Sequence, residues 1–323
     1  MKKFKTIISI ITLFAVVVGL ISGLLIFAGQ KKSNRVVVTI FPIYEIAREI
    51  MGNDEEITLL QTGGVDLHNY IPTANDIVTI SKCELFIFIG GNSDNWVEDI
   101  IRSASNVNLK TLELLSQVET LEESNENIVQ PNPNHIHGDE EEHDIVHADE
   151  HIWMSLKNMM TMTEIVLESL LLVYPERSVI LQENANNYIS KLGNLHFRYE
   201  EEIGGSTKSL LVADRFPFRY LTYDYGIGYH AAFSSCSAEI EASPSTITSL
   251  IETVNNSNLN YIIVLESSNN SLAETVISGC NHPHNVEILI LHSCQSIDAD
   301  NLGKITFLDI MENNLTNLKK ALN

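Results

Sequence analysis

The sequence predicts an α/β protein of two related lobes, each with a parallel sheet, joined by one long helix. Short apolar runs alternate with helical patterns from residue 36 onward, and runs that are apolar on both faces are typical of parallel strands covered by helices. The order strand, Phe-Pro, helix occurs once in each half, at Phe41-Pro42 and at Phe216-Pro217. Residues 176–202 can form one uninterrupted helix between the halves. The 323 residues are enough for two lobes and an accessory segment.

Residues 1–35 form a separate N-terminal segment. Three lysines among the first five residues precede an apolar run from Ile7 to Ala28, which is the pattern of a secretory segment. The run is long enough to span a bilayer, because about 20 apolar residues suffice, and Phe27-Ala28-Gly29 is a poor cleavage site. We expect an uncleaved membrane anchor with its basic end inside. A cleaved signal and a buried core helix are the alternatives.

The first lobe is expected over residues 36–175, and its elements alternate along the chain. The predicted strands are residues 36–40, 57–61, 85–89 and 107–109. The predicted helices are residues 44–51, 76–81 and 96–103, with a further helix from residue 156.

Residues 119–150 interrupt this alternation and are predicted to form a mobile loop. The loop is acidic and rich in Asn and Pro, a composition that does not favour a packed core. Residues 135–151 contain five histidines and seven carboxylates. The histidines within the loop are His135, His137, His143 and His147. Imidazole suits zinc, so we interpret the loop as an accessory metal-collecting or metal-sensing arm; a solvated acidic linker is the alternative.

The linking helix is expected at residues 176–203 and the second lobe at residues 204–323. The strands predicted in this lobe are residues 210–213, 261–265 and 286–291. Four cysteines occur, Cys83, Cys236, Cys280 and Cys294, and none is spaced as a Cys-x-x-Cys zinc site. Cys280 and Cys294 are the favoured disulfide pair because a strand-length segment separates them.

The charge excludes several classes of partner. Residues 1–35 hold six of the 20 basic residues and no acidic ones, so the remainder has 14 basic against 42 acidic residues. Binding to nucleic acid or anionic lipid needs clustered Lys and Arg, and this composition favours cations instead.

Two histidines of the first half are candidate metal ligands. His68 follows a predicted strand, and ligands gather at the carboxyl ends of strands in open α/β sheets. Asp66 could orient the His68 ring. His151 lies where the acidic loop meets the apolar Ile152-Trp153, which is expected to dock into the core and fix His151 in place.

A rival motif overlaps His151. Residues 147–151 match the His-x-x-Glu-His pattern of one group of zinc peptidases. That chemistry needs a helix that presents both histidines on one face, and the low-complexity run before His147 gives no such helix. A zinc-dependent hydrolase therefore remains only as an alternative function.

The matching runs along residues 36–323 resemble the cluster of metal-binding receptors of ABC transporters, the zinc- and manganese-receptor family. These runs are residues 38–44, 63–70, 90–96, 151–155, 220–226, 239–244 and 292–293. The acidic His-rich insert before His151 is typical of the zinc branch. The resemblance implies two α/β lobes joined by a rigid helix, with one metal bound in the cleft between them.

The same resemblance implies a ligand set and a function. His68 and His151 match the first-lobe ligands, Glu239 matches a carboxylate ligand of the family, and His292 falls where many members have Asp. The implied function is a monomeric receptor at the outer face of the cell membrane, which is not an enzyme. It would capture Zn²⁺, or Mn²⁺, and deliver it to an ABC permease. A surface adhesin or a metal buffer without a permease is the alternative from another class.

Two departures from the family pattern affect these expectations. Arg215 stands where many members have a third His, so Asp214 becomes a reserve ligand. No Cys precedes Cys83, so the lipidated Cys common in such receptors has no counterpart, and the apolar N-terminal helix is expected to replace it as the tether.

Overall fold

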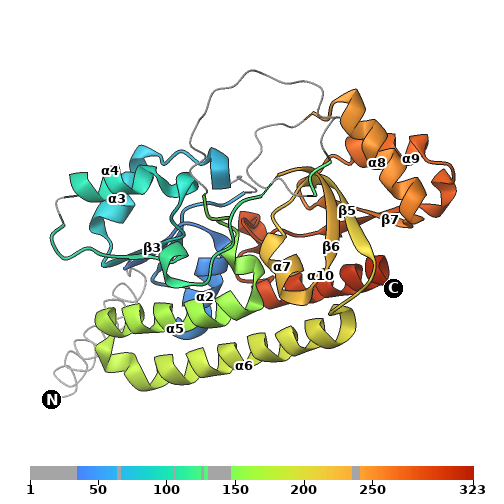
Figure 1. The fold of residues 1–323 in the computed structure, drawn as a ribbon. Helices are drawn as coiled ribbons and strands as arrows, with labels where there is room; N and C mark the ends of the chain where they lie inside the picture. The colour runs from blue at the N-terminus through green and yellow to red at the C-terminus, as the bar shows by residue number, and fades with distance from the viewer. Residues whose placement is uncertain (1–34, 64–66, 105, 125–126, 130–146, 235–240) are drawn as a thin grey trace, which may run out of the picture.

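The computed structural model describes residues 35–63, 67–104, 106–124, 127–129, 147–234 and 241–323 (Figure 1). Two four-stranded parallel sheets form the centres of two lobes, with strand orders β2-β1-β3-β4 and β6-β5-β7-β8. The two orders are the same when the strands of each lobe are counted from its own start. This confirms the predicted pair of related parallel lobes.

The first lobe contains the elements up to α5. Its strands are β1 (Val36–Val38), β2 (Ile57–Leu59), β3 (Leu85–Phe88) and β4 (Lys110–Glu113). Its helices are α2 (Phe41–Met51), α3 (Ala74–Lys82), α4 (Trp96–Ser103) and α5 (Leu156–Val173).

The second lobe follows the long helix α6 (Ser178–Ile203). Its strands are β5 (Ser209–Arg215), β6 (Gly228–Phe233), β7 (Tyr261–Leu265) and β8 (Glu287–Leu291). Its helices are α7 (Arg219–Tyr225), α8 (Pro244–Ser257), α9 (Ser271–Gly279) and α10 (Phe307–Leu322).

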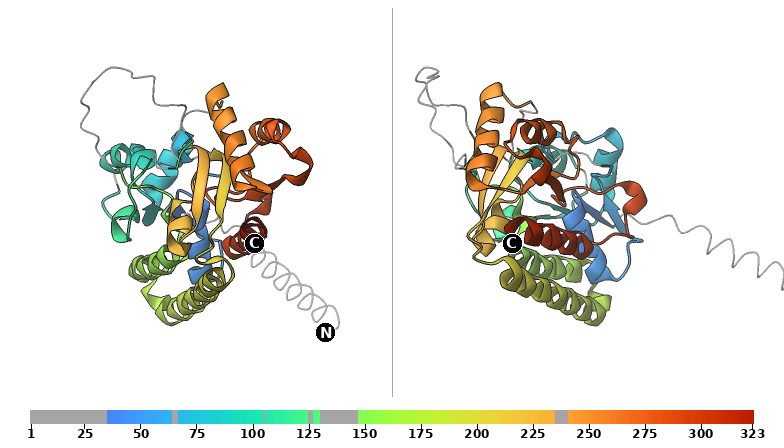
Figure 2. Two further views of the ribbon diagram at one scale, coloured as in Figure 1. Left: turned by 45° about the vertical axis from the view of Figure 1, so that its right-hand side comes forward. Right: turned by 90° about the vertical axis from the view of Figure 1, so that its right-hand side faces the viewer.

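The long helix α6 connects the lobes physically. It packs against α5 and α2 on the first-lobe side and against α10 on the second-lobe side, and both views of Figure 2 show α5 and α6 side by side beneath the sheets. One cluster of buried apolar side chains continues from β1 and α2 through α5 and α6 into β5 and α10. Because burial of apolar surface is the main stabilising contribution, this shared core resists separation of the lobes.

Several elements differ from their sequence expectation. Helix α2 begins at Phe41-Pro42 rather than at residue 44, because a proline has no N–H to lose in the first helical turn. The predicted strand at residues 107–109 is observed later, as β4. The strand β6 was not predicted; its sequence begins Gly228-Tyr229-His230 and lacks a continuous apolar run.

The predicted loop at residues 119–150 is described only at its two ends. Isolated β-bridges pair Glu122 with Ala148 and Ile128 with Ala231, so both ends are held against neighbouring backbone. His135, His137 and His143 lie outside the described residues, whereas His147 is described and exposed.

The expected Cys280–Cys294 disulfide is wrong. Cys280, Cys294 and Cys83 are all free thiols, and Cys236 lies outside the described residues. Cys280 precedes the five-residue strand β8 and Cys294 follows it, so about 16 Å of strand separates them. Bridged cysteines have Cα atoms within about 7 Å, which a strand-length separation does not allow.

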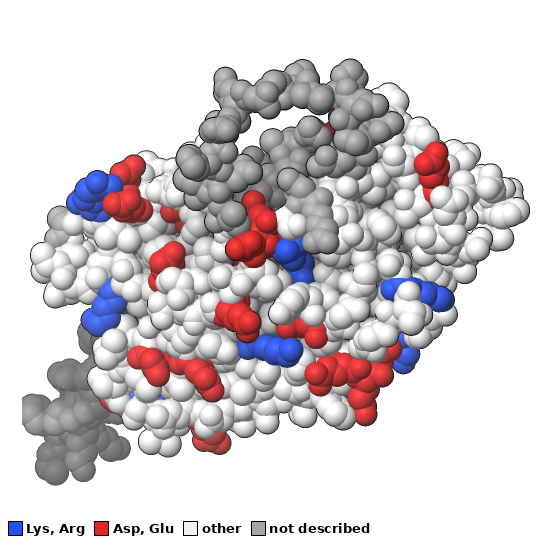
Figure 3. All heavy atoms as spheres, in the orientation of Figure 1, with Lys and Arg blue, Asp and Glu red and all other residues white. Residues whose placement is uncertain are grey.

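The N-terminal anchor prediction concerns residues outside the described part of the chain. Within the described ranges, no helix is both long enough and apolar enough to cross a bilayer. On the face shown in Figure 3, acidic side chains are spread widely with single basic side chains among them, in keeping with the acidic composition.

Candidate metal centre

His68 lies at the carboxyl side of the first sheet, in a short 3-10 turn (Leu67–Asn69) that follows β2. Leu67 is fully buried and packs into the main core, so the turn has a fixed position. The backbone N–H of Gly63 donates to the carbonyl of Ile297 at 3.1 Å, which ties the start of this loop to the second lobe. Asp66, the expected orienting residue, lies outside the described residues.

A buried serine and a buried carboxylate hold the His68 ring. The Ser93 hydroxyl lies 2.7 Å from His68 Nδ1 and also bonds to Glu150 Oε2. The Ser93 N–H donates to Glu150 Oε1 at 3.1 Å, and Glu150 Oε2 lies 3.8 Å from His68 Nδ1. The three side chains therefore form a chain from carboxylate to hydroxyl to imidazole.

The glycine turn after β3 makes room for this chain. Gly91 has φ 76°, a left-handed conformation that glycine adopts without steric cost. A Cβ atom at Gly91 would lie 2.3 Å from Glu150 Oε1. The side chain of Glu150 can therefore lie against Ser93 only because residue 91 has no side chain.

His151 is held by the carboxylate two residues before it. Asp149 Oδ1 accepts from the backbone N–H of His151 at 2.9 Å and lies 3.0 Å from His151 Nδ1. His151 directly precedes a buried 3-10 turn, Ile152–Met154, whose side chains anchor in the main core. This confirms that Ile152-Trp153 docks into the core. The side chains of His151 and Asp149 are 2% and 1% exposed.

The two first-lobe histidines are brought together. Their ring centroids lie 5.4 Å apart at an interplanar angle of 58°. An ionised carboxylate can only accept a hydrogen bond, so Asp149 requires a proton on His151 Nδ1, and the chain through Ser93 requires one on His68 Nδ1. A neutral imidazole has one proton, so in both rings Nε2 carries the lone pair that a metal needs.

The segment around His151 also contacts the second lobe. The Tyr220 hydroxyl of α7 donates to the carbonyl of Asp149 at 2.7 Å. The indole N–H of Trp153 donates to the carbonyl of Ser293 at 2.7 Å. These two bonds place the His151 turn at the boundary between the lobes, next to the turn that carries His292.

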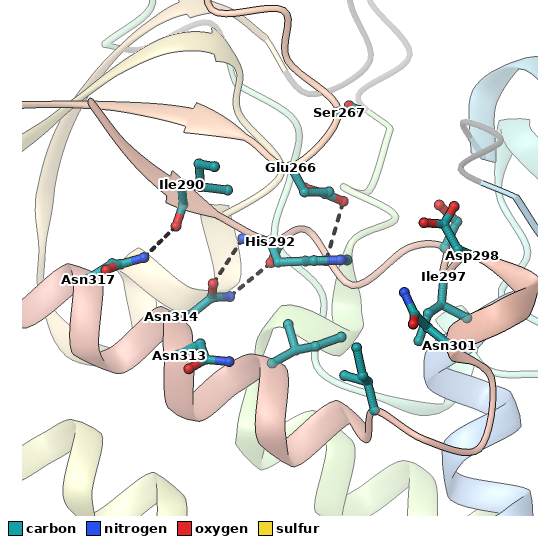
Figure 4. A pocket seen from close by; sticks show the side chains of 13 residues that line it. Glu266, Ser267, Ile290, His292, Ile297, Asp298, Asn301, Asn313, Asn314 and Asn317 are labelled. Carbon is teal, nitrogen blue, oxygen red and sulfur yellow. Dashed lines mark hydrogen bonds and ion pairs between the residues drawn. The ribbon is translucent and has the colours of Figure 1, made fainter. Parts of the chain in front are cut away.

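His292 follows β8 and has different surroundings (Figure 4). Its Nδ1 accepts from the backbone N–H of Cys294 at 2.9 Å and lies 3.3 Å from Glu266 Oε1. Asn314 of α10 accepts from the His292 N–H and donates to its carbonyl, both at 2.9 Å. Cys294 has φ 61°, a conformation that is uncommon for a residue with a side chain.

The two contacts of His292 Nδ1 require different protonation states of that nitrogen. The N–H of Cys294 needs a lone pair on Nδ1, whereas an attractive contact with the Glu266 carboxylate needs a proton there. With the Cys294 bond in place, the proton of neutral His292 lies on Nε2. Figure 4 shows the His292 ring below Glu266, among the residues that line a cavity of about 520 Å³.

The other predicted ligands have separate outcomes. Glu239 lies outside the described residues. The carboxylate of Asp214 accepts from the N–H of Arg215 at 2.8 Å and from the N–H of Leu265 at 3.4 Å, so both of its oxygens cap backbone at the end of β5. Among the residues that the structure describes, no three His, Cys, Asp or Glu side chains converge as a bound metal requires.

The His-x-x-Glu-His motif has no supporting helix. Residues 147–151 are not helical, and Ala148 pairs with Glu122 in an isolated bridge. His147 is exposed while His151 is buried, so the two histidines do not share one helical face. Glu150 instead contacts Ser93 and His68.

A second buried carboxylate lies beneath the site. Asp94 Oδ2 accepts from the N–H groups of Ile89 and Gly90 at 3.0 and 2.9 Å. Burial, together with the charge of Glu150, raises the pKa of Asp94 to about 7, against the lowering effect of these two N–H groups. Asp94 is 3% exposed.

Sequence reasoning named His68 and His151 as candidate ligands but missed the residues that hold their rings. Ser93 stands in an unremarkable Gly-Gly-Asn-Ser turn, and Asp149 and Glu150 are the last members of a long acidic run that hides them. The available signal was position: both carboxylates directly precede a histidine and an apolar pair that docks into the core.

Comparisons with known proteins give the family. A family model described as zinc-uptake complex component A, periplasmic, matches residues 36–321. The zinc-binding lipoprotein AdcA of Streptococcus pneumoniae is 26% identical over 298 residues, which cover 91% of this chain and 57% of that protein. This chain therefore spans little more than half the length of that relative.

Two further matches cover most of both chains. The high-affinity zinc uptake system protein ZnuA of Bacillus subtilis is 23% identical over 297 residues, which cover 89% of this chain and 87% of that protein. The crystal structure of the Zn(II)-bound ZnuA-like domain of Streptococcus pneumoniae AdcA matches with a TM-score of 0.71 at 24% identity, covering 89% of this chain and 98% of that one. The chain belongs to the family of ZnuA-type zinc-uptake components, which are substrate-binding receptors.

Proposed function

We propose that this chain is an extracytoplasmic receptor that captures Zn²⁺ and delivers it to an ABC-type permease. The observation that carries the proposal is the pair His68 and His151, with ring centroids 5.4 Å apart and each Nδ1 facing a carboxylate directly or through one hydroxyl. Imidazole nitrogen oriented by an outer carboxylate is the usual form of a protein zinc ligand. The relatives named above are zinc-binding or zinc-uptake proteins, which supports the same cargo.

The full ligand set that we propose is His68, His151, Glu239 and His292. Four protein ligands would close a tetrahedral site, as in zinc sites that do not catalyse. Nitrogen at three positions favours zinc over manganese, which prefers oxygen. Mn²⁺ is a secondary candidate, because carboxylates accept it.

A receptor that delivers its metal to an importing permease must meet that permease at the outer face of the membrane. We propose attachment to the outer face of the membrane through the apolar segment at residues 7–28. A relative described as a lipoprotein supports a location at the membrane surface, and the apolar segment is the proposed means of attachment in this chain. We propose that the receptor acts as a monomer and is not an enzyme. Residues 147–151 form no helix, so the His-x-x-Glu-His motif lacks the shared helical face that a zinc hydrolase needs.

A zinc and manganese titration of the full chain tests this proposal. We expect one tight zinc equivalent in the wild type, lost in a double variant His68→Ala, His151→Ala. The matched control is His282→Ala, His284→Ala, which removes two exposed histidines of the second lobe and should leave the tight equivalent intact. Several weak equivalents in the wild type, unchanged in the double variant, would mean that the His-rich loop alone binds metal.

A further inference from the structure

We propose that Glu150 is a positioning residue for His68: acting through the Ser93 hydroxyl, it fixes the proton of His68 on Nδ1 and so prepares Nε2 for the metal. The inference rests on the proposed zinc-receptor function and adds to it a residue outside the ligand set. It concerns the metal-free protein, so it can be tested without metal.

The contacts of Glu150 are directional. It is 2% exposed, and its Oε1 accepts from the Ser93 N–H at 3.1 Å while its Oε2 bonds to the Ser93 hydroxyl. A hydroxyl has one proton, and an ionised carboxylate has none to give. The Ser93 hydroxyl therefore donates to Glu150 and can only accept from His68 Nδ1, at 2.7 Å.

The consequence for His68 follows from its chemistry. A neutral imidazole carries its proton on one nitrogen and a lone pair on the other. With the proton fixed on Nδ1, the lone pair is on Nε2, which matches the arrangement at His151, where Asp149 accepts from Nδ1 directly. Two adjacent rings then present the same nitrogen for ligation.

The surroundings of Glu150 are built to keep this direction. Burying a carboxylate costs free energy unless it is hydrogen-bonded, and here both oxygens are bonded to the same residue, Ser93. Gly91 leaves the space that the carboxylate fills. The two bonds to Ser93 also fix which oxygen faces the backbone and which faces the hydroxyl.

A single isosteric substitution should reverse the direction of the hydrogen bonds between residue 150, Ser93 and His68. In Glu150→Gln, the backbone N–H of Ser93 requires an acceptor, so the amide oxygen takes the Oε1 position and the amide NH₂ takes the Oε2 position. The NH₂ then donates to the Ser93 hydroxyl, which must donate onward to His68 Nδ1. The proton of His68 moves to Nε2, where it blocks the metal.

The experiment compares four full-length proteins labelled with ¹⁵N-histidine: the wild type, Glu150→Gln, Ser93→Ala and the double variant. The tautomer of His68 is measured by long-range ¹H–¹⁵N correlation without metal, with a His68→Gln spectrum for assignment, and zinc affinity is measured in parallel. We expect the Nδ1–H form in the wild type and the Nε2–H form in Glu150→Gln. The zinc affinity of Glu150→Gln should fall by roughly 10- to 100-fold, as is usual when a group that orients a ligand is lost.

The double variant separates positioning from simple packing. Removing the hydroxyl removes the wrongly directed donor, so the double variant should bind zinc more tightly than Glu150→Gln alone. Glu113→Gln is the matched control, because Glu113 lies against the adjacent glycine, Gly90, as Glu150 lies against Gly91; it should change neither tautomer nor affinity.

The proposal is overturned if His68 keeps its Nδ1 proton in Glu150→Gln, or if the two substitutions weaken zinc binding additively. Failure of the proposed function would look different. In that case the wild type itself would bind no tight zinc equivalent, while the tautomer measurement would still report on the hydrogen-bond chain.

Discussion

The histidines of the two lobes are held in opposite ways. In the first lobe, Nδ1 of His68 and of His151 faces a group that accepts its hydrogen bond, and the carboxylates that hold the two rings are buried. In the second lobe, Nδ1 of His292 accepts a hydrogen bond from the backbone N–H of Cys294, and the ring borders an open cavity. In the proposed site, the first-lobe pair would therefore present Nε2 lone pairs to the metal without rearrangement, whereas His292 would first have to change its hydrogen bonding.

The difference suggests an order of events. Zinc would bind first to the prepared pair His68 and His151, and His292 would join by giving up the Cys294 bond and turning a protonated Nδ1 toward Glu266, 3.3 Å away. Glu266 is already fixed by the N–H and hydroxyl of Ser293 at 3.0 and 2.6 Å. A ligand that must rearrange contributes less net affinity than one already in place, because the rearrangement has its own cost.

The largest expected effect is the loss of a first-lobe ligand. His151→Ala should weaken zinc binding by more than about 100-fold, the upper size of effects from groups that only orient ligands. His292→Ala should lose less, because that ring is not prepared. Competition titration against a chelator measures both, and an equal or larger loss in His292→Ala would break the comparison.

The next effect is on stability and depends on pH. The pKa of Asp94 is about 7 in the folded protein against about 3.9 in an unfolded chain, so the folded state binds the proton more tightly. The contribution of Asp94 to stability is therefore greatest below about pH 4 and is lost as pH rises through about 7.

Asp94→Asn removes this loss while its amide oxygen still accepts from the N–H groups of Ile89 and Gly90. Relative to the wild type, the free energy of unfolding of the variant should increase by on the order of 1 kcal/mol for each pH unit between about pH 4 and pH 7. Urea unfolding of both proteins at pH 5 and pH 8 measures the difference. A constant difference between the two pH values would show that Asp94 does not titrate in this window.

Substitutions of Asp149, whose carboxylate bonds directly to His151, should have a smaller effect on zinc affinity, and its size should depend on the substituted side chain. Asp149→Ala removes the acceptor for both the backbone N–H and Nδ1 of His151, and zinc affinity should fall by roughly 10- to 100-fold. Asp149→Asn should lose less than Glu150→Gln, because one amide oxygen can replace Asp149 Oδ1 at both bonds. Isothermal titration of the three variants ranks them, and the reverse ranking would contradict the hydrogen-bond directions.

The smallest expected effect concerns the link between the lobes. Trp153→Phe keeps an aromatic ring but removes the hydrogen bond to the Ser293 carbonyl, which leaves a buried acceptor without that donor. The cost should be about 1–3 kcal/mol of stability, measured by thermal unfolding, with zinc affinity changed by only a few-fold. A large loss of affinity at unchanged stability would instead show that this bond sets the geometry of His292.

The fold, and the places of the two first-lobe histidines in it, could be predicted from the sequence because their signals are local. Apolar strands, the repeated Phe-Pro and the long helix each occupy one stretch of chain, and His68 and His151 lie beside such stretches. The Cys280–Cys294 disulfide was predicted wrongly, because a strand that separates two cysteines along the chain also holds them apart in space.

The orienting groups depend on contacts that the sequence does not show. Ser93 and Glu150 are 57 residues apart, and their meeting with His68 depends on the turn at Gly91. The protonation of His292 depends on a backbone N–H two residues later, which no side-chain pattern reveals. Glu239 and Asp66 lie outside the described residues, and their roles stay predictions.

A crystal structure of the full chain with one equivalent of zinc, with anomalous data at the zinc edge, tests the central claim most directly. We predict a single strong anomalous peak for a zinc ion that is coordinated by Nε2 of His68 and Nε2 of His151. Ser93 and Asp149 should still be hydrogen-bonded to the two Nδ1 atoms. A zinc ion coordinated by Nδ1 of either ring, or located only at the His-rich loop, would contradict this claim.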